Sequence, residues 1–266
     1  MSRLSCWWRT RQSQRQYANL PKPSVVNVEM GHQVGYFETP TGCWWLPLSE
    51  DIVAVTMRLG NIFEPEIVAE ASNHIKPGSN VLDLGSNFGQ MAVLFSGMTG
   101  SSGTVHAFEA DPFVCRLLRR NIEANSAANI IVHETAVWRE SGQILFYPVQ
   151  DFVRFNTFGA YGIDPKATTG RTVTSTAIDS LDLPGNISFM KIDVQGSDLY
   201  AMEGAIRTIE RNKMPILFEF ETVLQDDFGT SFRDYESLLS RLQYKIEKFI
   251  GNNNYLIKPI ALQTAQ

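Results

Sequence analysis

The sequence predicts a doubly wound α/β fold whose sheet has about seven strands, is mostly parallel and ends in an antiparallel C-terminal edge. Two observations support this prediction. From about residue 61, short apolar strand-like segments alternate with helix-like segments, a pattern typical of right-handed βαβ units. Near the C-terminus, the strand-like segments 244–250 and 255–259 are joined by Gly251-Asn252-Asn253-Asn254, which predicts an antiparallel hairpin.

The first half of this pattern is regular. Asp111-Pro112 marks a helix start, because aspartate caps free backbone N–H groups and proline suits the first helical position. The helix that follows has its apolar residues at the spacing of a single face. The expected helices are 61–76, 88–99 and 112–125, and the expected strands are 79–84, 104–109 and 129–133.

The alternation stops at residues 138–178 and then resumes. Segments 143–149 and 171–178 have strand-like composition, and between them lies a run rich in glycine and aromatic residues. Loops this long are usually functional or disordered, and disordered segments are poor in aromatics. We therefore expect residues 150–170 to form a substrate loop. The later strands are expected at 187–192 and 215–220, and the later helices at 198–212 and 231–243.

Composition excludes several classes of protein. The chain has 266 residues, 44% hydrophobic and 19% charged, with a formal net charge of −5. These values fit a globular protein and argue against a nucleic-acid partner. No apolar run is long enough to span a membrane. We expect an N-terminal extension at 1–60 and one domain at 61–266.

The start of the chain differs from the rest, with five basic residues, no acidic residue and Trp7-Trp8 in the first 24 positions. It has no apolar core of the kind that follows the basic start of a secretory signal. It is expected to pack on the main domain or to lack order; a transit peptide and a weak contact with a membrane surface are the alternatives. Three scattered cysteines indicate a cytoplasmic protein with reduced thiols.

The strongest chemical signal is the turn Asp83-Leu84-Gly85-Ser86-Asn87-Phe88-Gly89, between a buried strand and a helix. Glycine allows a close approach to a ligand, and a helix start offers unpaired N–H groups. A dinucleotide fingerprint requires further glycines where Asn87 and Gln90 stand. The carboxylate of Asp83 suits a cationic group. The turn therefore favours an amino-acid-bearing nucleoside such as S-adenosylmethionine, although a purely structural turn is an alternative.

Glu109 ends the next expected strand, where a carboxylate can bind both hydroxyls of a ribose. Such a residue also occurs in nicotinamide enzymes, and it could instead be a simple capping acid. Ala110 follows it, and Ala136 lies after the third strand, where an adenine edge would rest. These three residues complete the predicted cofactor site.

Charged residues also end two later strands. Lys191 and Asp193 lie at the end of one, and Glu219 ends its expected neighbour. Ligands bind at the carboxyl edge of open α/β sheets, so these three are candidate catalytic residues. Structural ion pairing of Lys191 with either acid is the alternative. The histidines and cysteines lack the spacing of a metal site, and no metal is expected.

Several motifs occur in the order seen in the FkbM family, which the chain resembles over about residues 61–222. They are 81–89, 107–112, 121–122, 135–137, 178–181, 190–196, 203–205 and 215–219. The resemblance implies a class I, Rossmann-like methyltransferase that uses S-adenosylmethionine, with many relatives acting on sugar hydroxyls of glycans or natural products.

On this basis, the turn residues Asp83, Gly85, Ser86, Asn87 and Gly89 are expected to hold the amino-acid end of the cofactor. Asp193 is the candidate base, and Lys191 or Glu219 is expected to position the hydroxyl acceptor. Gln195 departs from the family, which usually has glutamate there. This departure makes a methyltransferase-like domain that binds without catalysis one alternative function. A nicotinamide-dependent oxidoreductase is the other.

Overall fold

The computed structural model describes residues 20–147, 157–251 and 253–260 of the chain. The basic start of the sequence with Trp7-Trp8 and residues 148–156 of the predicted substrate loop lie outside the described residues.

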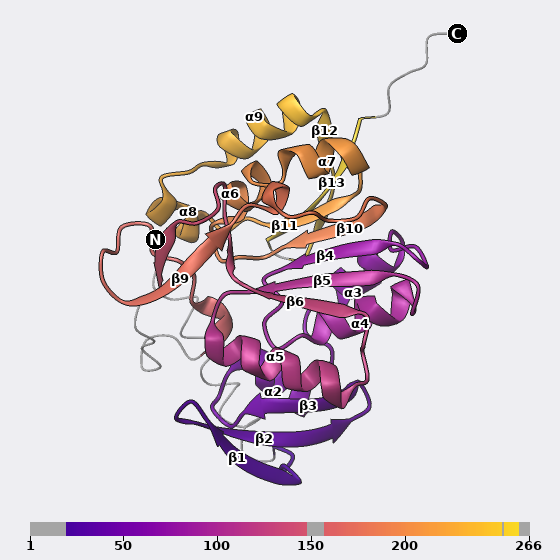
Figure 1. The fold of residues 1–266 in the computed structure, drawn as a ribbon, viewed down its shortest axis with the longest axis vertical. Helices are drawn as coiled ribbons and strands as arrows, with labels where there is room; N and C mark the ends of the chain where they lie inside the picture. Colours follow the sequence, from indigo (N-terminus) through magenta and orange to yellow (C-terminus); the bar gives the residue numbers. More distant parts are fainter. Residues whose placement is uncertain (1–19, 148–156, 252, 261–266) are drawn as a thin grey trace.

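In the described part of the chain, seven strands form the central sheet in the order β12-β13-β11-β10-β4-β5-β6 (Figure 1). The five strands from β11 to β6 are parallel, whereas β13 is antiparallel to β11 and β12 is antiparallel to β13. The predicted doubly wound sheet with an antiparallel C-terminal edge is confirmed. Its strands are β4 (Asn80–Leu84), β5 (Thr104–Glu109), β6 (Ile130–Glu134), β10 (Ile187–Ile192), β11 (Ile216–Glu219), β12 (Tyr244–Ile250) and β13 (Asn254–Pro259).

Helices cover both faces of this sheet, because neighbouring residues of a strand point to opposite sides. Leu82 and Met190 pack in a cluster with α6, α7 and α9, whereas Val81 and Phe189 pack with α3 and α4. Figure 1 shows these two layers on either side of the sheet. The helices are α3 (Pro65–Ser72), α4 (Gln90–Thr99), α5 (Pro112–Ala124), α6 (Asp198–Glu203), α7 (Ile206–Asn212), α8 (Thr222–Phe228) and α9 (Phe232–Leu242). None of the described helices is both long enough and apolar enough to cross a membrane.

A second, antiparallel sheet precedes the central one, where the sequence analysis assigned no strands. It consists of β1 (Val25–Glu29), β2 (His32–Thr39) and β3 (Gly42–Pro47), and it leads into α2 (Ile52–Arg58). This sheet lies against α5, at the end of the molecule away from α9 (Figure 1). Trp44 and Leu46 are fully buried in a cluster with Met57 of α2 and Leu117 of α5. Residues 25–58 therefore share a core with the α/β unit.

Asn121 of α5 and Asn125, which caps the end of this helix, attach the sheet by occupying the place of a neighbouring strand. Asn121 accepts from the Trp45 amide N at 2.6 Å and donates to the Trp45 carbonyl O at 3.2 Å. Asn125 makes the same pair of hydrogen bonds with the Cys43 backbone, at 2.9 and 2.7 Å. Asn121 also donates to the Phe88 carbonyl O at 2.8 Å. The open edge of β3 is thereby satisfied by side chains of a helix.

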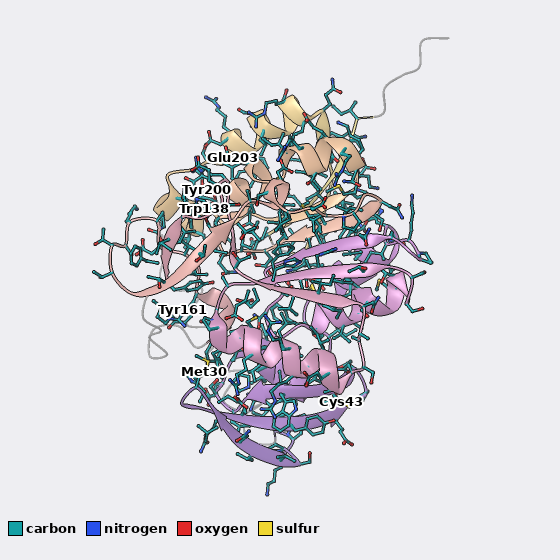
Figure 2. All side chains as sticks on the ribbon, in the orientation of Figure 1. Met30, Cys43, Trp138, Tyr161, Tyr200 and Glu203 are labelled. Atoms are coloured by element: carbon teal, nitrogen blue, oxygen red, sulfur yellow. The ribbon has the colours of Figure 1, made fainter. Side chains whose placement is uncertain are left out.

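A third small sheet occupies the interruption in the α/β pattern. It contains β7 (Ala136–Val137), β8 (Ile144–Tyr147) and β9 (Arg171–Thr176), in the order β7-β9-β8. Its two longer strands fall within the segments predicted to be strand-like, and they pair antiparallel. Beside it, the rings of Trp138 and Tyr200 meet edge to face at 4.6 Å, and Arg139 covers Tyr200 (Figure 2).

The prediction of one helix over 198–212 is wrong, because the chain turns between α6 and α7. A Cβ atom at Gly204 would lie 2.1 Å from the Trp138 carbonyl oxygen, so this close contact requires glycine. The carboxylate of Asp179 then caps α7 by accepting from the amides of Arg207 and Thr208 at 2.7 and 2.8 Å. Both causes come from distant parts of the chain, so helical periodicity alone could not reveal the break.

We expect Asn121→Leu to lower the free energy of unfolding by about 2–5 kcal/mol, because it leaves part-buried backbone groups of Trp45 and the buried Phe88 carbonyl without partners. Arg119→Leu, an exposed change on the same helix, should stay within about 0.5 kcal/mol of the wild type. Urea unfolding measures both. Equal stability of the two variants would contradict the attachment of β3 through Asn121.

Candidate active site

The carboxyl ends of β4, β5, β10 and β11 surround a cavity of about 300 Å³. This volume is at the lower end of the range of small-molecule sites. The cavity lies where open α/β sheets bind ligands. It brings together seven of the predicted cofactor-binding and catalytic residues: Gly85, Asn87, Glu109, Ala110, Ala136, Asp193 and Glu219.

The turn after β4 needs glycine for steric reasons. Gly85 has a φ of +82°, and a Cβ atom there would lie 1.8 Å from the Asp193 carbonyl oxygen. Gly89 precedes α4 with a φ of +87°, and its Cβ atom would lie 2.4 Å from Leu118 of α5. The first glycine therefore lets the turn touch the end of β10, and the second lets α4 approach α5. Gly89 does not line the cavity.

Glu109 connects this turn to the end of β5. Its carboxylate accepts from the amide N of Asn87 at 2.9 Å and from the amide N of Asp111 at 2.8 Å. Burial raises the pKa of Glu109 to about 7, although these hydrogen bonds oppose the shift. Each carboxylate oxygen keeps a second lone pair, so the side chain can still bind hydroxyl groups of a ligand in the cavity.

Asp83 and Lys191 lie beneath the cavity rather than in its wall. Asp83 is completely buried, and its carboxylate lies 3.6 Å from the Lys191 ammonium. The same ammonium lies 3.3 Å from the carboxylate of Asp193 and 3.2 Å from the Gly85 carbonyl oxygen. Lys191 and Ser86 line a smaller adjoining cavity of about 50 Å³. Asp83 lines neither of these cavities.

Gln195 joins the two candidate catalytic acids. Its side-chain amide donates to Asp193 at 2.9 Å and to Glu219 at 3.3 Å, using one hydrogen for each. Burial, followed by the charge of Asp193, raises the pKa of Glu219 to about 10. At neutral pH, Glu219 is therefore protonated and has a hydrogen-bond donor of its own.

Two further acids belong to this cluster and were not among the predicted site residues. Glu64 lines the cavity, and burial followed by the charge of Asp193 raises its pKa to about 7. Asp198 is completely buried at the start of α6, and the same two causes raise its pKa to about 7. For Glu64, the sequence offered one signal, the Glu64-Pro65 pair at the start of a helix.

The cavity has a roof made from two distant segments. Ile52 and Val53 of α2 line it from the N-terminal part of the chain. Residues of the segment 157–163 line it from the predicted substrate loop, including Phe158 and Tyr161. Figure 2 shows Tyr161 beside the first turn of α5. Within the part of the chain that the structure describes, no three His, Cys, Asp or Glu side chains are arranged to hold a metal ion.

The strand order, the glycine turn after β4 and the acid ending β5 define a class I, Rossmann-like methyltransferase. Residues 83–246 match the family model described as the methyltransferase FkbM domain, which covers more than half of the chain. The chain therefore belongs to the FkbM methyltransferase family. This confirms the resemblance seen in the sequence and sets aside a nicotinamide-dependent oxidoreductase.

Solved structures with a similar arrangement are distant in sequence. A methyltransferase FkbM from Methylobacillus flagellatus is 19% identical with a TM-score of 0.44, and the match covers 79% of this chain and 56% of that one. An S-adenosylmethionine-dependent O-methyltransferase from Thermotoga maritima is 10% identical with a TM-score of 0.47, covering 91% and 80%. A search of curated proteins finds no match.

Proposed function

We propose that this methyltransferase transfers the methyl group of S-adenosylmethionine to a hydroxyl oxygen of an uncharged sugar or natural product, with Asp193 as the general base. The observation that carries the proposal is the position of Asp193 on the cavity wall. Its carboxylate is one-quarter exposed, and it is held between Lys191 and the Gln195 amide.

The residues around the cavity fit the cofactor. S-adenosylmethionine carries a positive sulfonium, and the described wall holds several acids, among them Glu64, Glu109 and Glu221. In the proposal, Glu109 binds the ribose, Ala110 and Ala136 contact the adenine, and the turn from Gly85 to Gly89 faces the amino-acid end. Because Asp83 is buried against Lys191, it supports the turn from below instead of touching the ligand.

The chemistry divides between the cofactor and the chain. The bound cofactor supplies an electrophilic methyl group, so alignment and exclusion of water account for most of the acceleration. Asp193 accepts the hydroxyl proton of the acceptor. Lys191 and Gln195 fix its carboxylate, and protonated Glu219 donates a hydrogen bond to the acceptor.

The choice of an uncharged acceptor rests on the charge of the wall. Among the described residues that line the cavity, there is no lysine or arginine, whereas Glu64, Glu219 and Glu221 line it together. A phosphate or carboxylate group of an acceptor would meet no lysine or arginine among these described residues. Hydroxyl groups can bond to these acids, and Phe63 and Tyr161 offer apolar faces for a sugar ring.

We expect Glu109→Ala to weaken the binding of S-adenosylmethionine and S-adenosylhomocysteine by at least about tenfold, because the proposed hydrogen bonds between this carboxyl group and the two ribose hydroxyls are lost. Calorimetric titration measures this, with NAD as the ligand expected not to bind. Glu123→Ala, an exposed change on α5, is the control. Absence of binding to the wild-type protein would refute the cofactor assignment.

We expect Asp193→Asn to reduce turnover by about 10²–10⁴-fold while the affinity for S-adenosylhomocysteine stays within about threefold. Transfer of labelled methyl groups to a panel of neutral sugars and glycosides measures the first quantity, and calorimetry the second. Asp182→Asn, an exposed change after β9, should keep wild-type turnover. Full turnover of the Asp193 variant would show that another group removes the proton.

A substitution at Gln195 can distinguish an active enzyme from a domain that binds the cofactor without catalysis. Gln195→Glu removes two donors and adds a third acid beside Asp193 and Glu219. We expect lower turnover at neutral pH, with partial recovery at lower pH where the new glutamate is protonated as Glu219 already is. A pH profile of methyl transfer checks this. Activity that appears only in the variant would instead favour a wild-type protein that binds without catalysis.

A further inference from the structure

The buried carboxylate of Asp51 joins the two segments that roof the cavity. Asp51 is 1% exposed and immediately precedes α2. One of its oxygens accepts from the Ala54 amide N at 2.8 Å and caps the helix. The other accepts from the Phe158 amide N at 2.6 Å, across 107 residues of sequence. A single side chain thus fixes α2 and the segment 157–163 to one another.

The segment 157–163 is seated closely on the candidate active site. The Phe158 ring is buried between Phe113 and Phe88, with ring centroids 4.8 and 6.1 Å away. A Cβ atom at Gly159 would lie 2.9 Å from the Asn87 side chain. A Cβ atom at Gly162 would lie 2.7 Å from the Gln195 carbonyl oxygen. The segment therefore contacts both the turn after β4 and the residue that joins the two candidate catalytic acids.

A carboxylate buried as deeply as Asp51 is costly unless hydrogen bonds compensate for lost water. Burial raises the pKa of Asp51, and hydrogen bonds from Ala54, Phe158 and Thr157 oppose this shift. A serine would cap α2 about as well, because serine is a preferred residue at this position. Capping alone does not explain the second oxygen, which is directed at the segment over the cavity.

We propose that Asp51 is a positioning residue that holds the segment 157–163 closed over the cavity, so that a bound adenosyl ligand is shielded from water and leaves slowly. This rests on the proposed function for the identity of the ligand. If Asp51 has this role, residues that precede the family domain contribute to the binding site. Ile52, Val53 and the residues that they face then enclose the ligand together.

The central experiment compares Asp51→Ser with wild type in the full chain. Serine keeps the cap on Ala54 but cannot reach the Phe158 amide at the same time. We expect a melting temperature close to wild type, a dissociation rate of S-adenosylhomocysteine about tenfold higher by stopped flow, and faster hydrogen exchange confined to amides 157–163. Asp51→Ala should show the same two changes and a lower melting temperature, because the cap is lost as well.

Two matched pairs of variants distinguish a positioning role from a general loss of structure. Asp179→Ser alters a carboxylate that caps α7 in the same way and lines no part of the cavity, so ligand dissociation should be unchanged. Gly162→Ala should lift the segment from Gln195 and speed dissociation, whereas Gly185→Ala adds a methyl group in open space and should not.

The outcomes are distinct. Wild-type dissociation and exchange rates in Asp51→Ser would overturn the positioning role, and faster exchange throughout the chain would reduce Asp51 to a structural residue. If wild type binds no adenosyl ligand, the proposed function fails. The exchange at 157–163 then still decides whether Asp51 holds this segment.

Discussion

The buried ammonium group of Lys191 is the interaction on which the site depends. Burial alone would lower the pKa of Lys191, but the charges of Asp193 and Asp83 outweigh this and raise it. The group therefore stays charged, and it joins the end of β10 to the end of β4 and to the Gly85 carbonyl oxygen. Removal of the ammonium group, or of an acid that pairs with it, would leave buried charge without compensation. The ammonium group therefore holds the Gly85 turn and Asp193, the candidate base, next to one another.

Among the described residues, acids outnumber cations at the carboxyl edge of the sheet, and protonation and hydrogen bonding reduce this excess of negative charge. Glu219 takes up a proton, and the Gln195 amide gives one hydrogen to each of two acids. A glutamate at position 195 would remove that compensation. The departure from the family pattern at Gln195 therefore has a local physical reason, and it does not by itself indicate a loss of catalysis. The remaining negative potential is complementary to a cationic methyl donor.

Much of the α/β unit could be predicted from the sequence, because apolar strands, the Asp111-Pro112 cap and the terminal hairpin are local patterns. The convergence of Gly85, Glu109 and Asp193 followed from the rule that parallel strands end at one edge. Other features depended on contacts between distant residues. The break at Gly204 depends on the Trp138 carbonyl, and the burial of Asp83 depends on Lys191. Neither contact leaves a periodic signal in the sequence.

The N-terminal region shows why a family domain is not the same as a binding site. The family match begins at residue 83, yet the roof of the cavity includes Ile52 and Val53. A series of contacts places these residues. Asn121 of α5 and Asn125 at its C-cap hold β3, and the sheet of β1, β2 and β3 packs on α2. Asp51 then joins α2 to the segment over the cavity. Because α5 begins at the cavity and ends at the small sheet, this one helix links the proposed cofactor site to the segments that cover it. A domain cut at residue 83 would divide β4 and remove Ile52, Val53, Phe63 and Glu64 from the wall of the cavity.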